Sequence, residues 1–171
     1  MDIRRLVRIA LLAALVAVAT LVLRIPMPAT EGYINVGDAV IVAGALLLGG
    51  WSAGLAGGIG SALADGLGGY AHWAPFTLFI KGGEGLVIGV LYQWFKPDLA
   101  KPMGILLAGL LASVGLLCMV IGYFVVEIFL YSMGPALASL PGNLLQAGAS
   151  LVLGLLLVLA LHRSSFDPKT P

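Results

Sequence analysis

Charged side chains interrupt stretches of the sequence that are otherwise apolar. Lys81 and Glu84 lie near the middle of the run APFTLFIKGGEGLVIGVLY, and Asp38, Asp65 and Glu127 lie in similarly apolar surroundings. Such groups can neutralise one another, bind a polar solute or relay protons. Each costs roughly 2.5–3.5 kcal/mol at the centre of a membrane-spanning helix, so it normally faces a bundle interior or a wet cavity. These positions therefore predict a polar site inside a membrane protein.

The sequence contains no phosphate-binding loop, no zinc-protease motif and no dinucleotide-binding fingerprint. GxxxxGK[ST], HExxH and GxGxxG are all absent. The single cysteine, Cys118, excludes a disulfide framework and a thiol metal site, and we expect neither a metal nor a cofactor. We predict that the chain is not an enzyme, and that any energy for transport comes from an ion gradient or from another polypeptide.

The composition indicates a lipid environment. Of the 171 residues, 60% are hydrophobic and only 10% are charged, and the mean hydropathy is +1.07. Soluble domains carry about 25% charged residues. The net charge of +1 gives no reason to expect nucleic-acid binding. We predict one all-α integral membrane domain over residues 1–171.

The apolar segments predict six transmembrane helices, because a helix needs roughly 20 residues to cross the hydrocarbon core. The second and third are short and separated only by GGWS, which favours a tight helical hairpin. The expected spans are Leu6–Leu23, Gly37–Leu48, Ala53–Gly69, Pro75–Phe95, Met103–Tyr131 and Gly142–Leu161.

The basic residues predict the orientation. With six spans, seven of the nine fall on one side, which the positive-inside rule assigns to the cytoplasm together with both termini; they are Arg4, Arg5, Arg8, Lys96, Lys101, Arg163 and Lys169. The alternative is a cleaved signal peptide ending near the triplet Ala17-Val18-Ala19. We favour a retained first helix, because cleavage would place the N-terminus outside.

Placed by depth, the polar residues of the spans gather in the outer half. Helical spacing puts Lys81 and Glu84 on one face of the fourth span. The expected outward-facing pocket is formed by Asp38, Asp65, Lys81, Glu84, Tyr123, Glu127, Asn143 and Gln146.

Two outer connections extend this set. The segment RIPMPATEGYINV has 13 residues, longer than a bundle turn needs, and loops of this kind are often lids. It contributes Tyr33 and Asn35, and the outer turn GGYAHWAP contributes His72 and Trp73.

Several alternatives stay open at this point. Lys81 and Glu84 form either ligand contacts or a structural ion pair. Asn143 and Gln146 contact a ligand or hydrogen-bond between helices. Pairs of alanines four residues apart on the first span pack within the chain or against a partner; they are Ala10, Ala13, Ala14 and Ala17.

The stretches GYINVGDAVIVAGALLLGG and ADGLGGYAHWAPFTLFIKGGEGLVIG resemble the substrate-binding S components of energy-coupling factor (ECF) vitamin transporters. The likeness is greatest to the hydroxymethylpyrimidine, pyridoxine and riboflavin types. The resemblance implies a protein of a prokaryotic plasma membrane that captures a vitamin from outside. It further implies a lid around Tyr33–Asp38, and docking through the four alanines onto a transmembrane coupling protein that carries two cytoplasmic ATPases.

The side chains suggest a small, flat, polar heterocycle as the ligand. Tyr33, Trp73 and Tyr123 would stack on it, and amide side chains would bond its nitrogens and hydroxyls. A pyrimidine or pyridine vitamin suits this set best, and riboflavin comes next. The rival hypothesis is an autonomous ion-coupled carrier or channel. Against it, no comparable polar residues continue through the cytoplasmic half of the spans.

Overall fold

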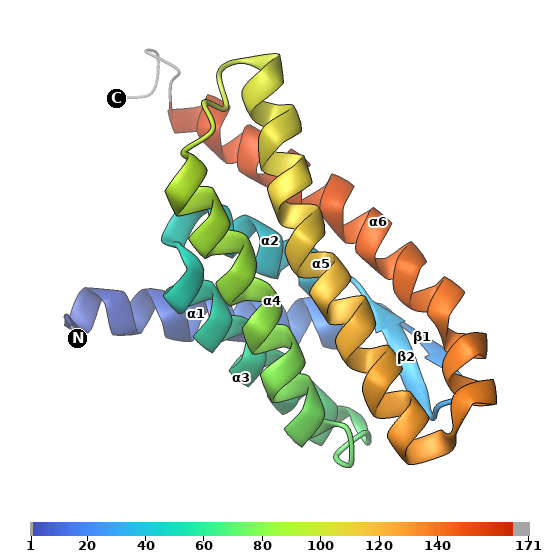
Figure 1. Cartoon of the computed structure of the whole chain (residues 1–171). Helices are drawn as coiled ribbons and strands as arrows, with labels where there is room; N and C mark the ends of the chain where they lie inside the picture. The colour runs from blue at the N-terminus through green and yellow to red at the C-terminus, as the bar shows by residue number, and fades with distance from the viewer. Residues whose placement is uncertain (1, 166–171) are drawn as a thin grey trace.

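The computed structural model describes residues 2–165 and contains, within them, six helices and one two-stranded sheet (Figure 1). In chain order these are α1 (Ile3–Val22), β1 (Arg24–Met27), β2 (Gly32–Asn35), α2 (Gly37–Leu48), α3 (Gly50–Gly68), α4 (Ala74–Phe95), α5 (Pro102–Tyr131) and α6 (Met133–Ser165). Lys169, one of the basic residues used to predict the orientation, lies outside the described residues.

Four helices in this part of the chain are long and apolar enough to cross a membrane: α1, α4, α5 and α6. The 12-residue α2 is apolar but only about 18 Å long at 1.5 Å per residue, against a hydrocarbon core of about 30 Å. The 19-residue α3 is rich in glycine and does not reach the same hydropathy. The predicted hairpin is present, because a single residue, Gly49, joins α2 to α3.

The short helix α2 occupies the centre of the fold. It packs against α1, α3, α4 and α6, and nine of its twelve residues are buried. Apolar residues of α2 form the main core cluster with residues of α3 to α6. Because α2 is surrounded by other helices, the polar side chain at its beginning, Asp38, is fully buried.

The glycines of α3 allow two neighbouring helices to approach closely. A Cβ atom at Gly58 would lie 2.5 Å from the Leu78 carbonyl oxygen of α4, and one at Gly60 would lie 2.4 Å from the Ala13 carbonyl oxygen of α1. Both distances are shorter than real Cβ contacts. Any larger residue would therefore push α3 away from α4 or α1.

The four alanines of α1 do not share one environment. Ala10 and Ala14 are exposed, Ala17 is half-buried, and Ala13 is buried in a cluster with Ala56 of α3. Ala13 therefore serves packing inside the chain, whereas Ala10 and Ala14 remain on the outer surface of α1.

The long first connection is a β-hairpin rather than an irregular loop. Arg24 pairs with Asn35, and Met27 pairs with Gly32, in an antiparallel register. Pro26 is tolerated because a two-stranded ribbon has free edges where a strand needs no N–H donor. Figure 1 shows the hairpin in the region between α1 and α6, and β2 contacts both helices.

The start of α6 differs from the sequence prediction. We expected the sixth span to begin at Gly142, but the helix begins at Met133 and continues through Pro141. Ser132, with φ of +80°, alone connects α5 to α6. A proline inside a helix removes one backbone hydrogen bond without ending it where neighbouring groups compensate. Asn143 and Gln146 thus lie well inside α6, not in its first turn.

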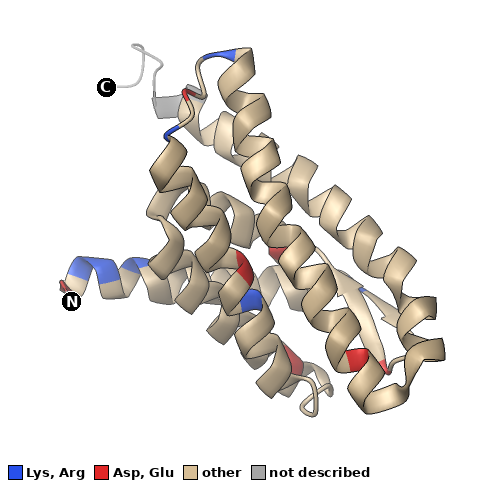
Figure 2. Cartoon of the chain, viewed as in Figure 1, with Lys and Arg blue, Asp and Glu red and all other residues tan. Residues whose placement is uncertain are grey.

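Charged residues are separated along the bundle. Figure 2 shows Lys and Arg at the beginning of α1 and around the connection of α4 to α5, while most Asp and Glu lie away from these ends. In α4, a basic position lies close to an acidic one. The residues that the sequence places in the outer half of the spans are thus mainly acidic.

Candidate ligand-binding site

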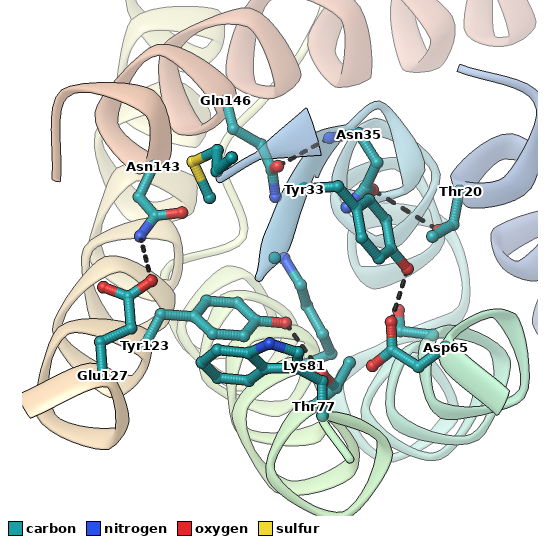
Figure 3. Close-up of a pocket in the computed structure, with 14 residues that line it drawn as sticks. Thr20, Tyr33, Asn35, Asp65, Thr77, Lys81, Tyr123, Glu127, Asn143 and Gln146 are labelled. Atoms are coloured by element: carbon teal, nitrogen blue, oxygen red, sulfur yellow. Dashed lines mark hydrogen bonds between the residues drawn. The ribbon is translucent and has the colours of Figure 1, made fainter. Parts of the chain in front are cut away.

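A pocket lies between the hairpin, α1 and the ends of α3 to α6 that adjoin it (Figure 3). Its interior leaves only about 30 Å³ for the centres of water molecules, room for about two waters. The hairpin covers it with residues of both strands. The lining residues are Thr20, Met27, Gly32, Tyr33, Asn35, Ser61, Asp65, Trp73, Thr77, Lys81, Tyr123, Glu127, Asn143 and Gln146.

Aromatic side chains form one wall. The Trp73 ring packs edge-on against Tyr123, with ring centroids 5.8 Å apart. The Tyr123 hydroxyl donates to Thr77 Oγ1 at 3.2 Å. The Lys81 ammonium lies 5.4 Å from the Tyr123 ring centroid, within the range of a cation–π interaction. The wall therefore combines flat apolar faces with polar edges.

Lys81 forms the centre of the floor, and its charge is already paired. Its Nζ atom donates to Asp38 Oδ1 and, at 3.3 Å, to Glu84 Oε2. All three side chains are at least 99% buried. Asp38 and Glu84 lie behind Lys81 and do not line the pocket. Lys81 and Glu84 thus form an ion pair in this structure, and Asp38 on α2 is a further partner.

A hydrogen-bond chain connects this floor to the hairpin. Gln146 Nε2 donates to Asp38 Oδ2 at 2.6 Å, and Gln146 Oε1 accepts from the Asn35 backbone N–H at 2.8 Å. Asn35 Oδ1 in turn accepts from the Gly37 N–H at 2.8 Å, which satisfies a free donor at the start of α2. Gln146 of α6 therefore links β2 to α2.

Tyr33 connects the hairpin to α3. Its hydroxyl donates to Asp65 Oδ1 at 2.5 Å (Figure 3). Burial and the neighbouring Asp65 carboxylate raise the pKa of the Tyr33 hydroxyl, so that this group stays protonated and remains a donor. The Arg24 guanidinium lies 5.7 Å from the Tyr33 ring centroid, and the Tyr70 ring packs against Tyr33.

Glu127 on α5 is held by neutral groups from α6. Ser139 Oγ donates to its Oε2 atom, and Asn143 Nδ2 donates to its Oε1 atom at 3.5 Å. The second bond is long, because N–H···O bonds in proteins are usually near 2.9–3.0 Å. Neither partner is charged, although Glu127 is 99% buried.

Two buried polar atoms of the pocket have no hydrogen-bond partner: Asp65 Oδ2 and Trp73 Nε1. Both residues line the pocket and are more than 95% buried. Buried donors and acceptors are nearly always satisfied in folded proteins. The pocket thus offers a free acceptor and a free donor to a ligand.

The structure brings nine of the twelve predicted site residues to the pocket lining. Asp38 and Glu84 are one layer behind, in contact with Lys81. His72 is exposed and does not line the pocket; its Nε2 atom lies 3.2 Å from the Tyr131 hydroxyl. The nine are Tyr33, Asn35, Asp65, Trp73, Lys81, Tyr123, Glu127, Asn143 and Gln146.

Five lining residues were not among the predicted site residues. Thr20 lies near the C-terminal end of α1, where a polar residue in an apolar helix was a usable signal. Ser61 and Thr77 each lie four residues from a predicted carboxylate or lysine on the same helix. Met27 and Gly32 face each other in the hairpin, and only the strand register identifies them.

Comparisons with known proteins identify the family of the chain. A family model described as ECF-type riboflavin transporter, S component, matches residues 1–163. The chain is 43% identical over 139 residues to an uncharacterized protein in gap 3'region of Pyrococcus woesei, which covers 81% of this chain and 88% of that protein. It is 30% identical over 165 residues to the thiamine precursor transporter HmpT of Lactococcus lactis subsp. cremoris, covering 95% of this chain and 90% of HmpT.

The family match covers all six helices except the last residues of α6. Proteins of this family bind small vitamin-type ligands and work with ECF partner proteins in a membrane. The apolar helices, the closed polar pocket and the comparisons lead to one conclusion: this chain belongs to the ECF-type riboflavin transporter S component family, and it is a multi-pass membrane transport protein, not an enzyme.

Proposed function

We propose that the chain binds a small, flat, nitrogen-containing vitamin or vitamin precursor from outside a prokaryotic cell, and delivers it inward through an ECF-type importer. A pyrimidine or pyridine ring is the preferred ligand, and riboflavin is the second candidate. The ATPase activity resides on partner proteins, because the sequence has no phosphate-binding loop.

The observation that carries this proposal is the composition of the pocket. Aromatic faces stand beside amides, carboxylates and hydroxyls in a site that is more polar than the surrounding helices. Ligand sites of this kind use apolar rings for contact area and a few fixed polar groups for orientation. Asn35, Asn143 and Gln146 would bond ring nitrogens and hydroxyls, and Trp73 and Tyr123 would contact the ring faces.

The size of the pocket supports a single-ring ligand. With room for about two waters, the hairpin has to move before any vitamin enters, and a single ring requires a smaller displacement than the three fused rings of riboflavin. The hairpin is then the lid. Tyr33 and Asn35, which attach it to α3 and α6, are the contacts that opening would break.

Two further arguments support the pyrimidine type and the topology. A relative covering nearly the whole chain bears the name of a thiamine precursor transporter. In our proposal α2 and α3 cross as a short pair, with α2 buried at the centre and α3 exposed on one face, giving six crossings and two cytoplasmic termini. The basic residues at the start of α1 and between α4 and α5 support this orientation.

For coupling, we assign docking on the membrane partner to the exposed face of α1. Ala10 and Ala14 are exposed there and four residues apart, which allows close approach of another helix. Ala17 is half-buried at the edge of that face. Ala13 is turned into the core, so it would support docking only by holding α1 against α3.

The test is binding by the purified full chain in detergent. Native mass spectrometry of the protein as purified would identify a retained small molecule. Calorimetric titration with 4-amino-5-hydroxymethyl-2-methylpyrimidine and with riboflavin would then measure affinity. We expect tight binding of one of them and no flux into liposomes containing this chain alone. Flux without a partner would instead support the autonomous carrier, and absence of binding to both would contradict the proposal.

A further inference from the structure

We propose that Asp65 and Glu127 are the specificity-determining residues of the pocket, and that they select a ligand bearing an amino group or a protonated ring nitrogen. The ligand class is an amino-substituted, protonatable N-heterocycle, in preference to a neutral or anionic ring. This inference rests on the proposed function, because it assumes that the pocket is the ligand site.

Lys81 is the one cationic side chain in the pocket lining. Its ammonium is already shared between Asp38 and Glu84, which come from α2 and from its own helix. Two carboxylates face one ammonium there, so no positive charge is left over for an anionic ligand. The Lys81 charge acts on Asp65 only at longer range, because its direct ion pairs are with Asp38 and Glu84.

Asp65 is the first unbalanced carboxylate. Its Oδ1 atom accepts from the Tyr33 hydroxyl, but Oδ2 makes no hydrogen bond. Thr77 lies near enough to interact with the carboxylate, yet its hydroxyl makes no bond of normal geometry to Oδ2. A fully buried carboxylate oxygen without a donor is costly. A ligand N–H group would satisfy it.

Glu127 is the second unbalanced carboxylate. Its Oε1 atom has only the 3.5 Å bond from Asn143, and no cation lies among its hydrogen-bond partners. In Figure 3, Glu127 and Asn143 lie on one side of the pocket and Asp65 with Tyr33 on the other. The unpaired Asp65 Oδ2 atom and the weakly bonded Glu127 Oε1 atom therefore come from opposite sides of the pocket.

The basic groups near the rim form no ion pair with Asp65 or Glu127, although His72 acts on Asp65 at longer range. The Arg24 guanidinium donates to the Gly68 carbonyl at 3.1 Å and lies beside the Tyr33 ring. His72 is exposed and contacts Tyr131. Neither residue lines the pocket. The described pocket thus presents two carboxylates that form no ion pair within the protein.

Such a pocket matches an aminopyrimidine better than an isoalloxazine ring. An aminopyrimidine carries an exocyclic amino donor and a ring nitrogen that a neighbouring carboxylate keeps protonated. The polar edge of isoalloxazine offers mainly carbonyl and ring-nitrogen acceptors. The free Trp73 Nε1 donor is then left for a hydroxyl oxygen of the ligand.

The experiment compares three ligands, two of which differ in a single group. The full chain is titrated by calorimetry with 4-amino-5-hydroxymethyl-2-methylpyrimidine, with its 4-oxo analogue, and with riboflavin. We expect the amino compound to bind at least about tenfold more tightly than the other two, since hydrogen bonds to a charged acceptor exceed that factor. Asp65→Asn and Glu127→Gln should each reduce this preference about tenfold.

The matched control is Asp98→Asn, the same chemical change at an exposed carboxylate in the connection between α4 and α5. It should leave all three affinities unchanged. Thermal melting of each variant without ligand verifies folding. If one of the two pocket variants fails to fold, the other still tests the proposal.

The outcomes separate this inference from the proposed function. Loss of the amino preference in Asp65→Asn and Glu127→Gln supports the assignment. Equal or tighter binding of the 4-oxo compound or of riboflavin, or an unchanged preference in folded variants, overturns the assignment and leaves the proposed function intact. Failure of the wild-type chain to bind any of the three overturns both.

Discussion

Buried carboxylates lie both directly behind the Lys81 floor of the pocket (Asp38 and Glu84) and in its walls (Asp65 and Glu127), but only the first two are paired with a cation. Asp38 and Glu84 share the Lys81 ammonium, and Gln146 adds a neutral donor to Asp38. Asp65 and Glu127 have only hydroxyl and amide partners, and one oxygen of Asp65 has none.

This difference separates groups that build the site from groups that are available to a ligand. A buried ion pair whose members come from different helices fixes how those helices sit, and removal of one member leaves a charge uncompensated. A buried carboxylate without a cation contributes little to folding and gains most from a bound donor. Mutations in the floor should therefore lower the stability of the protein, whereas mutations in the walls should lower its affinity for the ligand.

The largest effect is expected for Lys81→Met. The substitution leaves Asp38 and Glu84 buried side by side without a cation, which should cost about 3–5 kcal/mol of unfolding free energy. Thermal melting in detergent and titration with a denaturing detergent would measure it. Lys101→Met is the matched control, because Lys101 pairs with Asp98 at the exposed surface, and such pairs contribute little. Equal melting temperatures of the two variants would contradict the structural role of the floor.

A smaller loss of stability is expected for Gln146→Leu. The change removes the donor to Asp38 and the acceptor for the Asn35 N–H, and each unsatisfied buried group costs about 1–3 kcal/mol. Because the hairpin loses its bond to α6, hydrogen exchange at the Asn35 amide should accelerate. Protection at Asn35 equal to that of the wild type would show that the hairpin is held closed by other contacts.

The walls should be tested through ligand affinity. Glu127→Ala and Asn143→Ala should each weaken binding of the retained ligand at least tenfold, about 1.4 kcal/mol. Calorimetric titration of the purified variants measures the change, and Ser150→Ala serves as the control, because Ser150 is buried on α6 without lining the pocket. Unchanged affinity in both folded variants would remove these residues from the site.

The smallest effect is expected for the stability of Asp65→Asn in the absence of ligand. Asparagine keeps an oxygen to accept from Tyr33 and removes a buried charge that has no cation, so the unfolding free energy should stay within about 1 kcal/mol of the wild type. Melting measurements without ligand provide the test. A loss as large as that of Lys81→Met would mean that Asp65 belongs with the floor, and the contrast between the two regions would fail.

Helix positions and most pocket residues could be predicted from the sequence, because a lipid environment restricts where charged side chains can lie. A charge such as Lys81 inside an apolar run has to face the interior, and helical spacing then places its neighbours. The limits of α2 were predicted as the structure has them, because glycines bound this apolar segment on both sides.

The structure differs from the sequence predictions where a feature depends on contacts between helices or strands. The hairpin depends on pairing of β1 with β2, and the sequence analysis predicted only a long connection that could act as a lid. The helical start of α6 depends on contacts such as Ser139 with Glu127, which outweigh the breaking tendency of Pro141. Asp38 as the main partner of Lys81 is 43 positions away, so no local spacing indicated it. The outward position of His72 depends on the short turn before α4.

The shortness of α2 also affects how far a solute has to travel. Asp38 at its first turn touches the pocket floor, and the helix ends at Gly49 after about 18 Å. For the transport that we propose, the part of the protein directly behind the floor is thus a buried three-turn helix that is shorter than a hydrocarbon core of about 30 Å.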